Sequence, residues 1–232
     1  MDESLIKPIA IPGIHQRFMP FFERITAGKK IKVLDVGAGH GAFTKKLFEE
    51  GYEMAACDMY PDYYHYSKVP CKQADLTKGL PYDDNSMDAI IAIEVMEHIQ
   101  DHSIFFSECQ RILRPGGKVL VSTPNILSLK SRVRFLFSGF FYSFKPLELE
   151  NYDGLQHVAG LTLDQYNYVA IRHGFQPAEV GFDKKQNTSR WLMFLYPFLH
   201  IYTWIKKIKP SIHNTVGLLT GRVLFMSFEV KG

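Results

Sequence analysis

The chain has 232 residues, of which 46% are hydrophobic and 22% are charged, with a formal net charge of +3 at pH 7. This composition excludes a disordered or fibrous chain, and the length suits one large domain with a sizeable core. Three unpatterned cysteines exclude a disulfide framework and predict a reducing compartment. The chain starts with an acidic segment, and no run of 18 apolar residues occurs. We therefore expect a cytoplasmic protein without a secretion signal or a membrane span.

The first predicted element is an amphipathic helix over residues 14–27. Ile14, Phe18, Phe22 and Ile25 recur at near-helical spacing, and Gly28 ends the pattern. Two placements remain open for this helix, because it could cover a ligand cleft or simply pack on a sheet.

A buried strand over residues 31–36 is predicted to run into a glycine turn, followed by a helix over 42–50. Gly37, Gly39 and Gly41 let the backbone bend sharply and approach a ligand with no Cβ in the way. A strand, a glycine turn and a helix N-terminus together form a cofactor cradle. A dinucleotide site needs a different glycine spacing, and a carboxylate just before the turn would repel a pyrophosphate. The turn therefore favours a cofactor with an amino-acid-like ammonium group, which Asp35 would suit.

The second strand, over residues 53–57, ends at Asp58. A carboxylate at this position can accept hydrogen bonds from both ribose hydroxyls, so Asp58 indicates a nucleoside cofactor. Residues 59–68 predict a short or irregular helix, and a third strand is expected over 69–73.

The fourth strand, over residues 88–93, leads to Glu94, Glu97 and His98. Their spacing of i, i+3 and i+4 would make them point the same way on one helical turn. Open α/β sheets bind ligands at this edge. His98 is the best-placed general base, because its ordinary pKa of about 6.5 lies near working pH. A structural role, in which His98 orients the loop, is the alternative.

The rest of the chain predicts further alternation of helices and strands around two less regular insertions, at about 124–160 and 184–221. The predicted elements are helix 102–113, strand 118–123, helix 162–173, strand 175–182 and a last strand over 222–230.

The stretch from Val33 to Gly41 resembles motif I of the class I S-adenosylmethionine (SAM) methyltransferases, and the stretch from Arg111 to Asn125 is also similar to this family. The resemblance covers residues 30–183, and 222–230 by position only. It implies an α/β, Rossmann-like fold for a single domain over 1–232. In that fold a seven-stranded, mostly parallel sheet has helices on both faces, strand order 3-2-1-4-5-7-6, and an antiparallel last strand.

The resemblance also implies SAM as the cofactor. Asp75 would accept a hydrogen bond from the adenine amino group, and the backbone of Leu76 would read the ring edge. The predicted cofactor-binding residues are Asp35, Gly37, Ala38, Gly39, Gly41, Asp58, Met59, Asp75, Leu76 and Glu94.

Methyl transfer from a sulfonium requires alignment of the acceptor and removal of its proton, for which His98 and Glu97 are the predicted catalytic residues. Glu94, Glu97, His98 and the distant His157 also look like the metal ligands of small-RNA 2′-O-methyltransferases, and the Glu-x-x-Glu-His part resembles ubiquinone-pathway O-methyltransferases. Methyltransferases without a metal carry the same pattern. The metal-free interpretation is favoured, and a divalent metal is the alternative.

The second insertion contains the most unusual segment. Residues 191–205 carry no charge, and Lys206, Lys207 and Lys209 follow them. The segment is too short to span a bilayer. Three interpretations stay open: a peripheral contact of 191–209 with the inner face of a membrane or with a lipid substrate, a homodimer interface, or plain core.

The sequence thus predicts methyl transfer from SAM to a small-molecule or lipid-linked acceptor, at an oxygen of a sugar or quinone-type intermediate. One alternative is a non-catalytic SAM-binding scaffold or regulatory protein. Another is an RNA 2′-O-methyltransferase. No RNA-binding motif accompanies the domain, so no nucleic-acid partner is expected.

Overall fold

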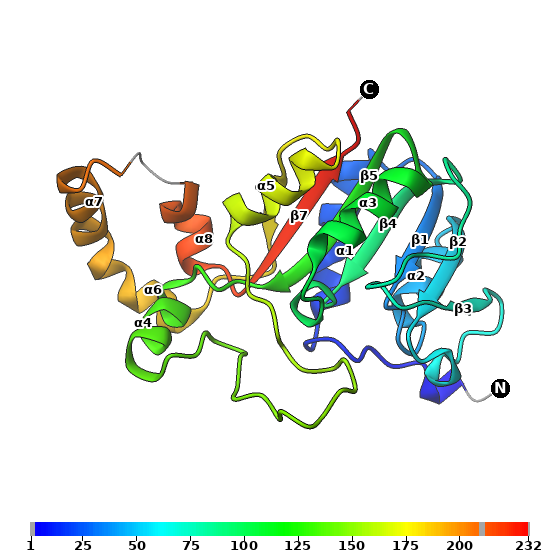
Figure 1. Cartoon of the computed structure of the whole chain (residues 1–232), viewed down its shortest axis with the longest axis horizontal. Coiled ribbons are helices and arrows are strands. Elements are labelled where there is room, and N and C mark those ends of the chain that lie inside the picture. Colours follow the sequence, from blue (N-terminus) through cyan, green and yellow to red (C-terminus); the bar gives the residue numbers. More distant parts are fainter. Residues whose placement is uncertain (1–2, 209–211, 232) are drawn as a thin grey trace.

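The computed structural model describes residues 3–208 and 212–231, which form an α/β fold with helices on both faces of one sheet (Figure 1). The strands are β1 (Lys32–Val36), β2 (Glu53–Asp58), β3 (Cys71–Gln73), β4 (Met87–Ile93), β5 (Leu113–Pro124), β6 (Glu179–Phe182) and β7 (Val223–Glu229). The helices are α1 (Ile14–Thr26), α2 (Ala42–Glu49), α3 (His102–Ile112), α4 (Leu129–Ser138), α5 (Leu163–Arg172), α6 (Asn187–Trp191), α7 (Tyr196–Ile205) and α8 (Val216–Thr220).

The seven strands lie in the order β3-β2-β1-β4-β5-β7-β6, so the predicted sheet is confirmed. β1 to β5 pair in parallel, and β7 runs antiparallel to both β5 and β6. Leu34 of β1 pairs with Ala55 on one side and with Ile90 on the other. The strand order therefore reverses beside β1, and the carboxyl ends of β1 and β4 flank the crevice where such sheets bind ligands.

Apolar side chains cover both faces of the central strands. Val33 and Ile91 pack with α1 and α2 on one face, whereas Leu34 and Ile90 pack with α3 and α5 on the other. Successive residues of a strand point to opposite faces, so a run of apolar residues is what two covered faces require. The ring of Phe18 contacts Phe225 of β7, so α1 packs on the sheet.

Three predicted strand boundaries were wrong. The third strand is only three residues long, because β3 is the short edge strand of the sheet. β5 begins at Leu113, which pairs with Met87 before the register shifts, so residues 114–117 belong to the strand. β6 begins at Glu179, and Phe175 makes only an isolated bridge with Val230.

The insertions contain helices that the sequence pattern did not predict. The Ser128 hydroxyl accepts a hydrogen bond from the amide of Ser131 and so caps α4. α4, α6, the turn Leu192–Leu195 and α8 surround the buried side chains of Leu129, Leu192 and Leu219. We call the four helices α4, α6, α7 and α8 the arm, and Figure 1 shows them gathered at one end of the sheet.

The interpretation of residues 191–205 as plain core is wrong. None of the residues in α7 is buried, and Trp191 and Trp204 are 73% and 80% exposed. No helix in the part of the chain that the structure describes has the length and apolar character needed to cross a membrane. Lys209, part of the predicted basic run, lies outside the described residues. The assignment of 1–232 to a single domain stays a prediction.

Replacement of Phe106 by alanine should destabilise the fold by about 3–5 kcal/mol, because its buried ring lies against Phe175 and Phe228. Urea unfolding measures the free-energy difference. Phe137→Ala is the matched control, since that ring is 84% exposed and its removal should change stability by less than about 0.5 kcal/mol. Equal losses in the two variants would contradict the packing of α3 on the sheet.

Candidate active site

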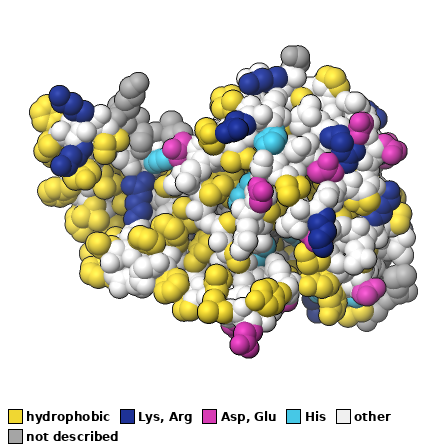
Figure 2. All heavy atoms as spheres, viewed as in Figure 1, with side chains coloured by type: hydrophobic (Ala, Val, Ile, Leu, Met, Phe, Trp, Pro, Cys, Tyr) yellow, Lys and Arg dark blue, Asp and Glu magenta, His cyan; other side chains and the backbone are white. Residues whose placement is uncertain are grey.

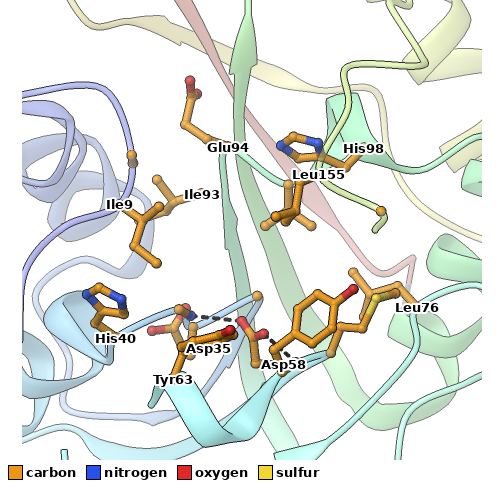
Figure 3. A pocket seen from close by; sticks show the side chains of 18 of the residues that line it. Ile9, Asp35, His40, Asp58, Tyr63, Leu76, Ile93, Glu94, His98 and Leu155 are labelled. Atoms are coloured by element: carbon orange, nitrogen blue, oxygen red, sulfur yellow. Dashed lines mark hydrogen bonds between the residues drawn. The ribbon is translucent and has the colours of Figure 1, made fainter. Parts of the chain in front are cut away.

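A cavity of about 900 Å³ lies at the carboxyl ends of β1, β2 and β4 (Figure 3). The glycine turn, residues 58–60, residues 74–77 and the segment after β4 line it. Every predicted cofactor residue except Gly41 lines this cavity. It also has the size of a small-molecule site in an enzyme.

The glycine turn depends on glycine at all three positions. Gly37, Gly39 and Gly41 have φ values of +69°, +52° and +83°, a region that side-chain-bearing residues rarely adopt. A Cβ on Gly37 would lie 2.5 Å from the side chain of Val95, and a Cβ on Gly39 would lie 2.9 Å from Ile9. Gly41 instead precedes α2 and packs against aromatic rings, so its role is structural.

Asp58 is held in place by two backbone amides. The amide of Gly39 donates to Oδ2 at 2.8 Å, and the amide of Tyr60 donates to Oδ1 at 2.8 Å. A carboxylate has about four acceptor positions, so each oxygen keeps capacity for a further donor. The side chain lines the cavity beside Met59, at the end of β2. It is therefore positioned to accept hydrogen bonds from hydroxyls of a bound ligand.

Asp35 and Asp75 have opposite electrostatic environments. Burial raises the pKa of Asp35 to about 7, although the Thr44 hydroxyl donates to its Oδ2 at 2.6 Å. Hydrogen bonds from Thr77 and then Lys78 lower the pKa of Asp75, whose side chain is partly exposed. Asp35 therefore gains most from a cation placed in the cavity, whereas Asp75 is ionised without one.

Glu94 does not share a helical turn with Glu97 and His98, so that prediction was wrong. Glu94 has a φ of +56° and precedes the short 3-10 turn Met96–His98. The Ser122 hydroxyl donates to its carboxylate at 2.8 Å, and burial raises the pKa of Glu94 to about 7. The left-handed residue redirects the chain at the end of β4, so Glu94 faces the cavity from another position.

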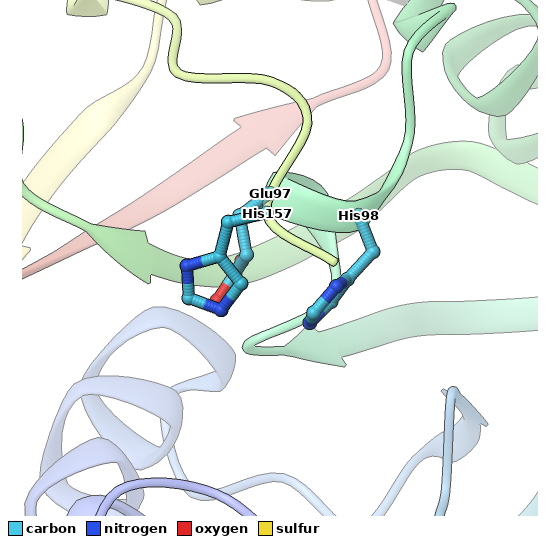
Figure 4. A group of neighbouring side chains, drawn as sticks. All are labelled: Glu97, His98 and His157. Carbon is cyan, nitrogen blue, oxygen red and sulfur yellow. The ribbon is translucent and has the colours of Figure 1, made fainter. Parts of the chain in front are cut away.

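Glu97, His98 and His157 form a cluster in which one candidate ligand atom from each lies within 4.8 Å of the others (Figure 4). The backbone carbonyl of Glu97 accepts from the amides of Val158 and Ala159, which fixes the loop that carries His157. Three of the four predicted metal ligands are thus brought together, and Glu94 lies outside the cluster.

His98 has the protonation state that a base requires. Its Nδ1 lies 3.0 Å from the carbonyl oxygen of Gln156, and because a carbonyl only accepts, Nδ1 must carry the proton. Burial lowers the pKa of His98, so the ring is neutral at pH 7. Its Nε2 is then an unprotonated acceptor, suited to receive a proton or to bind a metal.

The donor set of the cluster fits a divalent metal. Two imidazoles and one carboxylate are ligands that first-row metals accept. Glu97 is 1% exposed, and its carboxylate accepts from Thr123 at 3.2 Å. Burial and then the charge of Glu94 raise the pKa of Glu97 well above its ordinary value. A cation beside Glu97 would offset this cost of burying a negative charge.

Two segments of the cavity wall were not predicted. Residues 7–11, ahead of α1, place Ile9 over the glycine turn. Residues 153–155 close another side, where the Tyr60 hydroxyl donates to the carbonyl of Asp153 at 2.6 Å. Neither segment has a periodic pattern in the sequence. The aromatic residues after Asp58, which include Tyr60, are the one local feature connected with the second segment.

Residues 34–121 match the model of a family described as a methyltransferase domain. The chain is 34% identical over 103 residues to a demethylmenaquinone methyltransferase of Tropheryma whipplei, an alignment that covers 42% of each chain. It is 25% identical over 132 residues to a ubiquinone biosynthesis O-methyltransferase of Cereibacter sphaeroides, covering 52% of this chain and 53% of that one. The chain thus spans about half, or less, of the length of these curated relatives.

The fold is similar to that of a SAM-dependent methyltransferase from Archaeoglobus fulgidus, with a TM-score of 0.60 and 17% identity over 93% of this chain and 92% of that chain. Together with the family match, this confirms the fold and the resemblance to class I methyltransferases that the sequence predicted.

Asp35 should make stability depend on pH. Its folded pKa of about 7 exceeds the ordinary value of 3.8, so its contribution is present at low pH and is lost as pH rises toward and through 7. Asp35→Asn removes this pH-dependent loss of stability, because an asparagine side chain does not ionise. The stability of Asp35→Asn relative to the wild type should therefore increase by about 2–3 kcal/mol between roughly pH 5 and pH 8. Urea unfolding at several pH values measures it. The exposed control Asp62→Asn should show no such trend, and a flat difference for Asp35→Asn would refute the assignment.

Proposed function

We propose that the chain is a class I SAM-dependent methyltransferase that transfers a methyl group to an oxygen of a small-molecule or lipid-linked acceptor. The observation that carries the proposal is one cavity that holds both the fixed carboxylate of Asp58, beside the glycine turn, and the neutral imidazole of His98. The carboxylate is suited to accept hydrogen bonds from the hydroxyls of a nucleoside, and the imidazole is suited to accept a proton from the hydroxyl of an acceptor. Bound SAM would supply an electrophilic methyl group on a sulfonium.

The chain binds and orients the cofactor with residues of β1, β2 and the turn after β3. Asp58 accepts from the ribose hydroxyls, and Asp75 and Leu76 take the adenine end. Asp35 and Glu94, two buried carboxylates with raised pKa values, face the ammonium end, where a positive charge offsets their burial. Ala38 and Met59 complete the wall between these groups.

His98 removes the acceptor's proton. Nε2 accepts the hydroxyl proton while Nδ1 stays bonded to the Gln156 carbonyl, which keeps the ring in one orientation. The buried Glu97 fixes the following loop through its backbone carbonyl and lies beside the imidazole that becomes charged. The positive charge that forms on the imidazole favours the ionised form of Glu97, whose pKa burial otherwise raises, so Glu97 supports the same step.

The alternative use of the same cluster is metal binding. A divalent cation held by Glu97, His98 and His157 would polarise an acceptor hydroxyl and lower its pKa. The fit of the donor set supports this alternative for a catechol-like acceptor, which offers two adjacent oxygens.

A quinone-type acceptor is favoured over a sugar. The cavity wall near His98 includes the apolar side chains Ile93 and Leu155, which suit an aromatic ring. The names of the demethylmenaquinone and ubiquinone relatives point to the same class. A SAM-binding scaffold without catalysis would not need His98 held as an acceptor. RNA methylation would need an RNA-binding module, and we propose no nucleic-acid partner. A cytoplasmic location also remains a proposal.

Asp58→Ala should weaken SAM binding by about 2–4 kcal/mol, because the two ribose hydroxyls lose a charged acceptor. Isothermal titration calorimetry with SAM measures the change. Asp62→Ala removes an exposed carboxylate four residues away and should leave the affinity unchanged. Unchanged binding in Asp58→Ala would remove Asp58 from the site.

His98→Ala should lower turnover by about 10²–10⁴-fold with little change in SAM affinity, because it removes the base and not a cofactor contact. The assay follows methyl transfer from labelled SAM to a short-chain prenyl catechol. A matched series with a chelator separates the two uses of His98. Wild-type activity that survives chelation, with no metal by elemental analysis, would exclude the metal. Full activity in His98→Ala would exclude His98 from the reaction.

A further inference from the structure

The arm presents an apolar helix face to solvent. Phe198, Ile201, Tyr202 and Ile205 follow the spacing i, i+3, i+4 and i+7, which places them along one side of α7. Each is more than half exposed, whereas Tyr196 and Leu199 on another side pack toward the arm's own core. Helices normally bury such apolar side chains, so their exposure on α7 indicates a contact with an external apolar phase.

The arm and the segments that flank it carry charge of one sign only. Residues 125–147 and 184–221 contain ten Lys or Arg and no Asp or Glu. Lys206 and Lys207 stand exposed at the end of α7. Figure 2 shows hydrophobic side chains gathered over α7 and the rest of the arm, with Lys or Arg at the end of α7.

We infer that the arm is a membrane-docking surface, whose α7 face lies in the interfacial region of a bilayer with anionic headgroups. An exposed apolar stripe, with lysines at its end and no Asp or Glu within residues 184–221, has the two properties that interfacial helices combine. α7 has ten residues, about half of what a membrane-spanning helix needs, so it can bind only at the surface.

A second copy of the chain suits this face less well. Two arms in contact would bring lysines and arginines together, and the arm offers no acid to pair with them. An anionic leaflet supplies the missing negative charge at every position. The charge pattern therefore selects lipid over self-association.

The arm is connected to the active site through a row of rings. Phe135, near the end of α4, stacks on Phe141 with ring centroids 4.4 Å apart. The ring centroids of Phe141 and Phe144 are 6.2 Å apart, and those of Phe144 and His157 are 5.4 Å apart. Phe135 is 45% exposed, so the row runs from the surface of the arm to the catalytic cluster. Docking would thus bring a membrane-borne acceptor to the same side as His98.

Both tryptophans of the chain, Trp191 and Trp204, lie exposed on the arm and provide an intrinsic probe. Full-length protein is titrated with vesicles of phosphatidylcholine alone or with added phosphatidylglycerol. The tryptophan emission should shift to the blue, and the protein should co-sediment, only with the anionic vesicles, with binding that weakens as salt rises. This readout is independent of methyl transfer, so it stands or fails separately from the proposed function.

Lys206→Glu with Lys207→Glu should weaken binding by at least about thirtyfold, because each lysine near an anionic leaflet contributes about fivefold. Phe198→Ser with Ile205→Ser should abolish the emission shift. The control Lys29→Glu with Lys68→Glu makes the same charge change on exposed residues outside the arm and should bind like the wild type. Circular dichroism verifies that each variant is folded.

Three results would overturn the inference. Wild-type protein could bind anionic vesicles no better than neutral ones. The control could lose as much binding as the arm variants, which would indicate a general charge effect. Sedimentation could reveal a dimer that the Phe198/Ile205 variant dissociates, which would assign the face to a second copy.

Discussion

Burial of the central strands on both faces is the constraint from which the site follows. β1 and β4 carry apolar residues toward α1 and α2 on one side and toward α3 and α5 on the other. A polar group along such a strand would lose its water without gaining a partner. Polar side chains are therefore concentrated where the strands end, and Asp58 and Glu94 both stand at such ends. Asp35, the exception within β1, is tolerated because Thr44 donates to it and because it holds its proton near neutral pH.

The parts of the molecule that this constraint governs were predictable from the sequence. Apolar runs identified β2 and β4, the glycine turn marked the end of β1, and the carboxylates at the ends of β2 and β4 converge on one cavity as expected. Glycine adopts the positive φ values seen at Gly37 and Gly39 without a steric cost, so three glycines at alternate positions indicated a tight turn.

The parts that failed depend on contacts between distant residues. Nothing local indicates that Glu94 adopts a left-handed conformation, because Ser122 from β5 fixes its side chain there. The start of β5 at Leu113 follows from pairing with Met87, which overrides the usual effect of a Pro-Gly-Gly sequence. α7 was not predicted because residues 191–205 are apolar on nearly every side, so no polar face marks a helical period, and nothing local shows that its apolar residues lie exposed.

The cavity wall has two parts of different construction: strand ends with tight turns, and the loop over residues 139–160. The side of the cavity proposed for the cofactor is built from strand ends and tight turns, within the region 34–121 that matches the methyltransferase-domain model. The side proposed for the acceptor includes residues 153–157 of a long excursion, which is anchored to the turn after β4 because the amides of Val158 and Ala159 donate to the carbonyl of Glu97. Loops tolerate changes in length and sequence far better than buried strands do. For the proposed methyl transfer, exchange of this excursion alone would diversify the acceptor while the methyl donor stays the same, so the architecture is modular in an evolutionary sense.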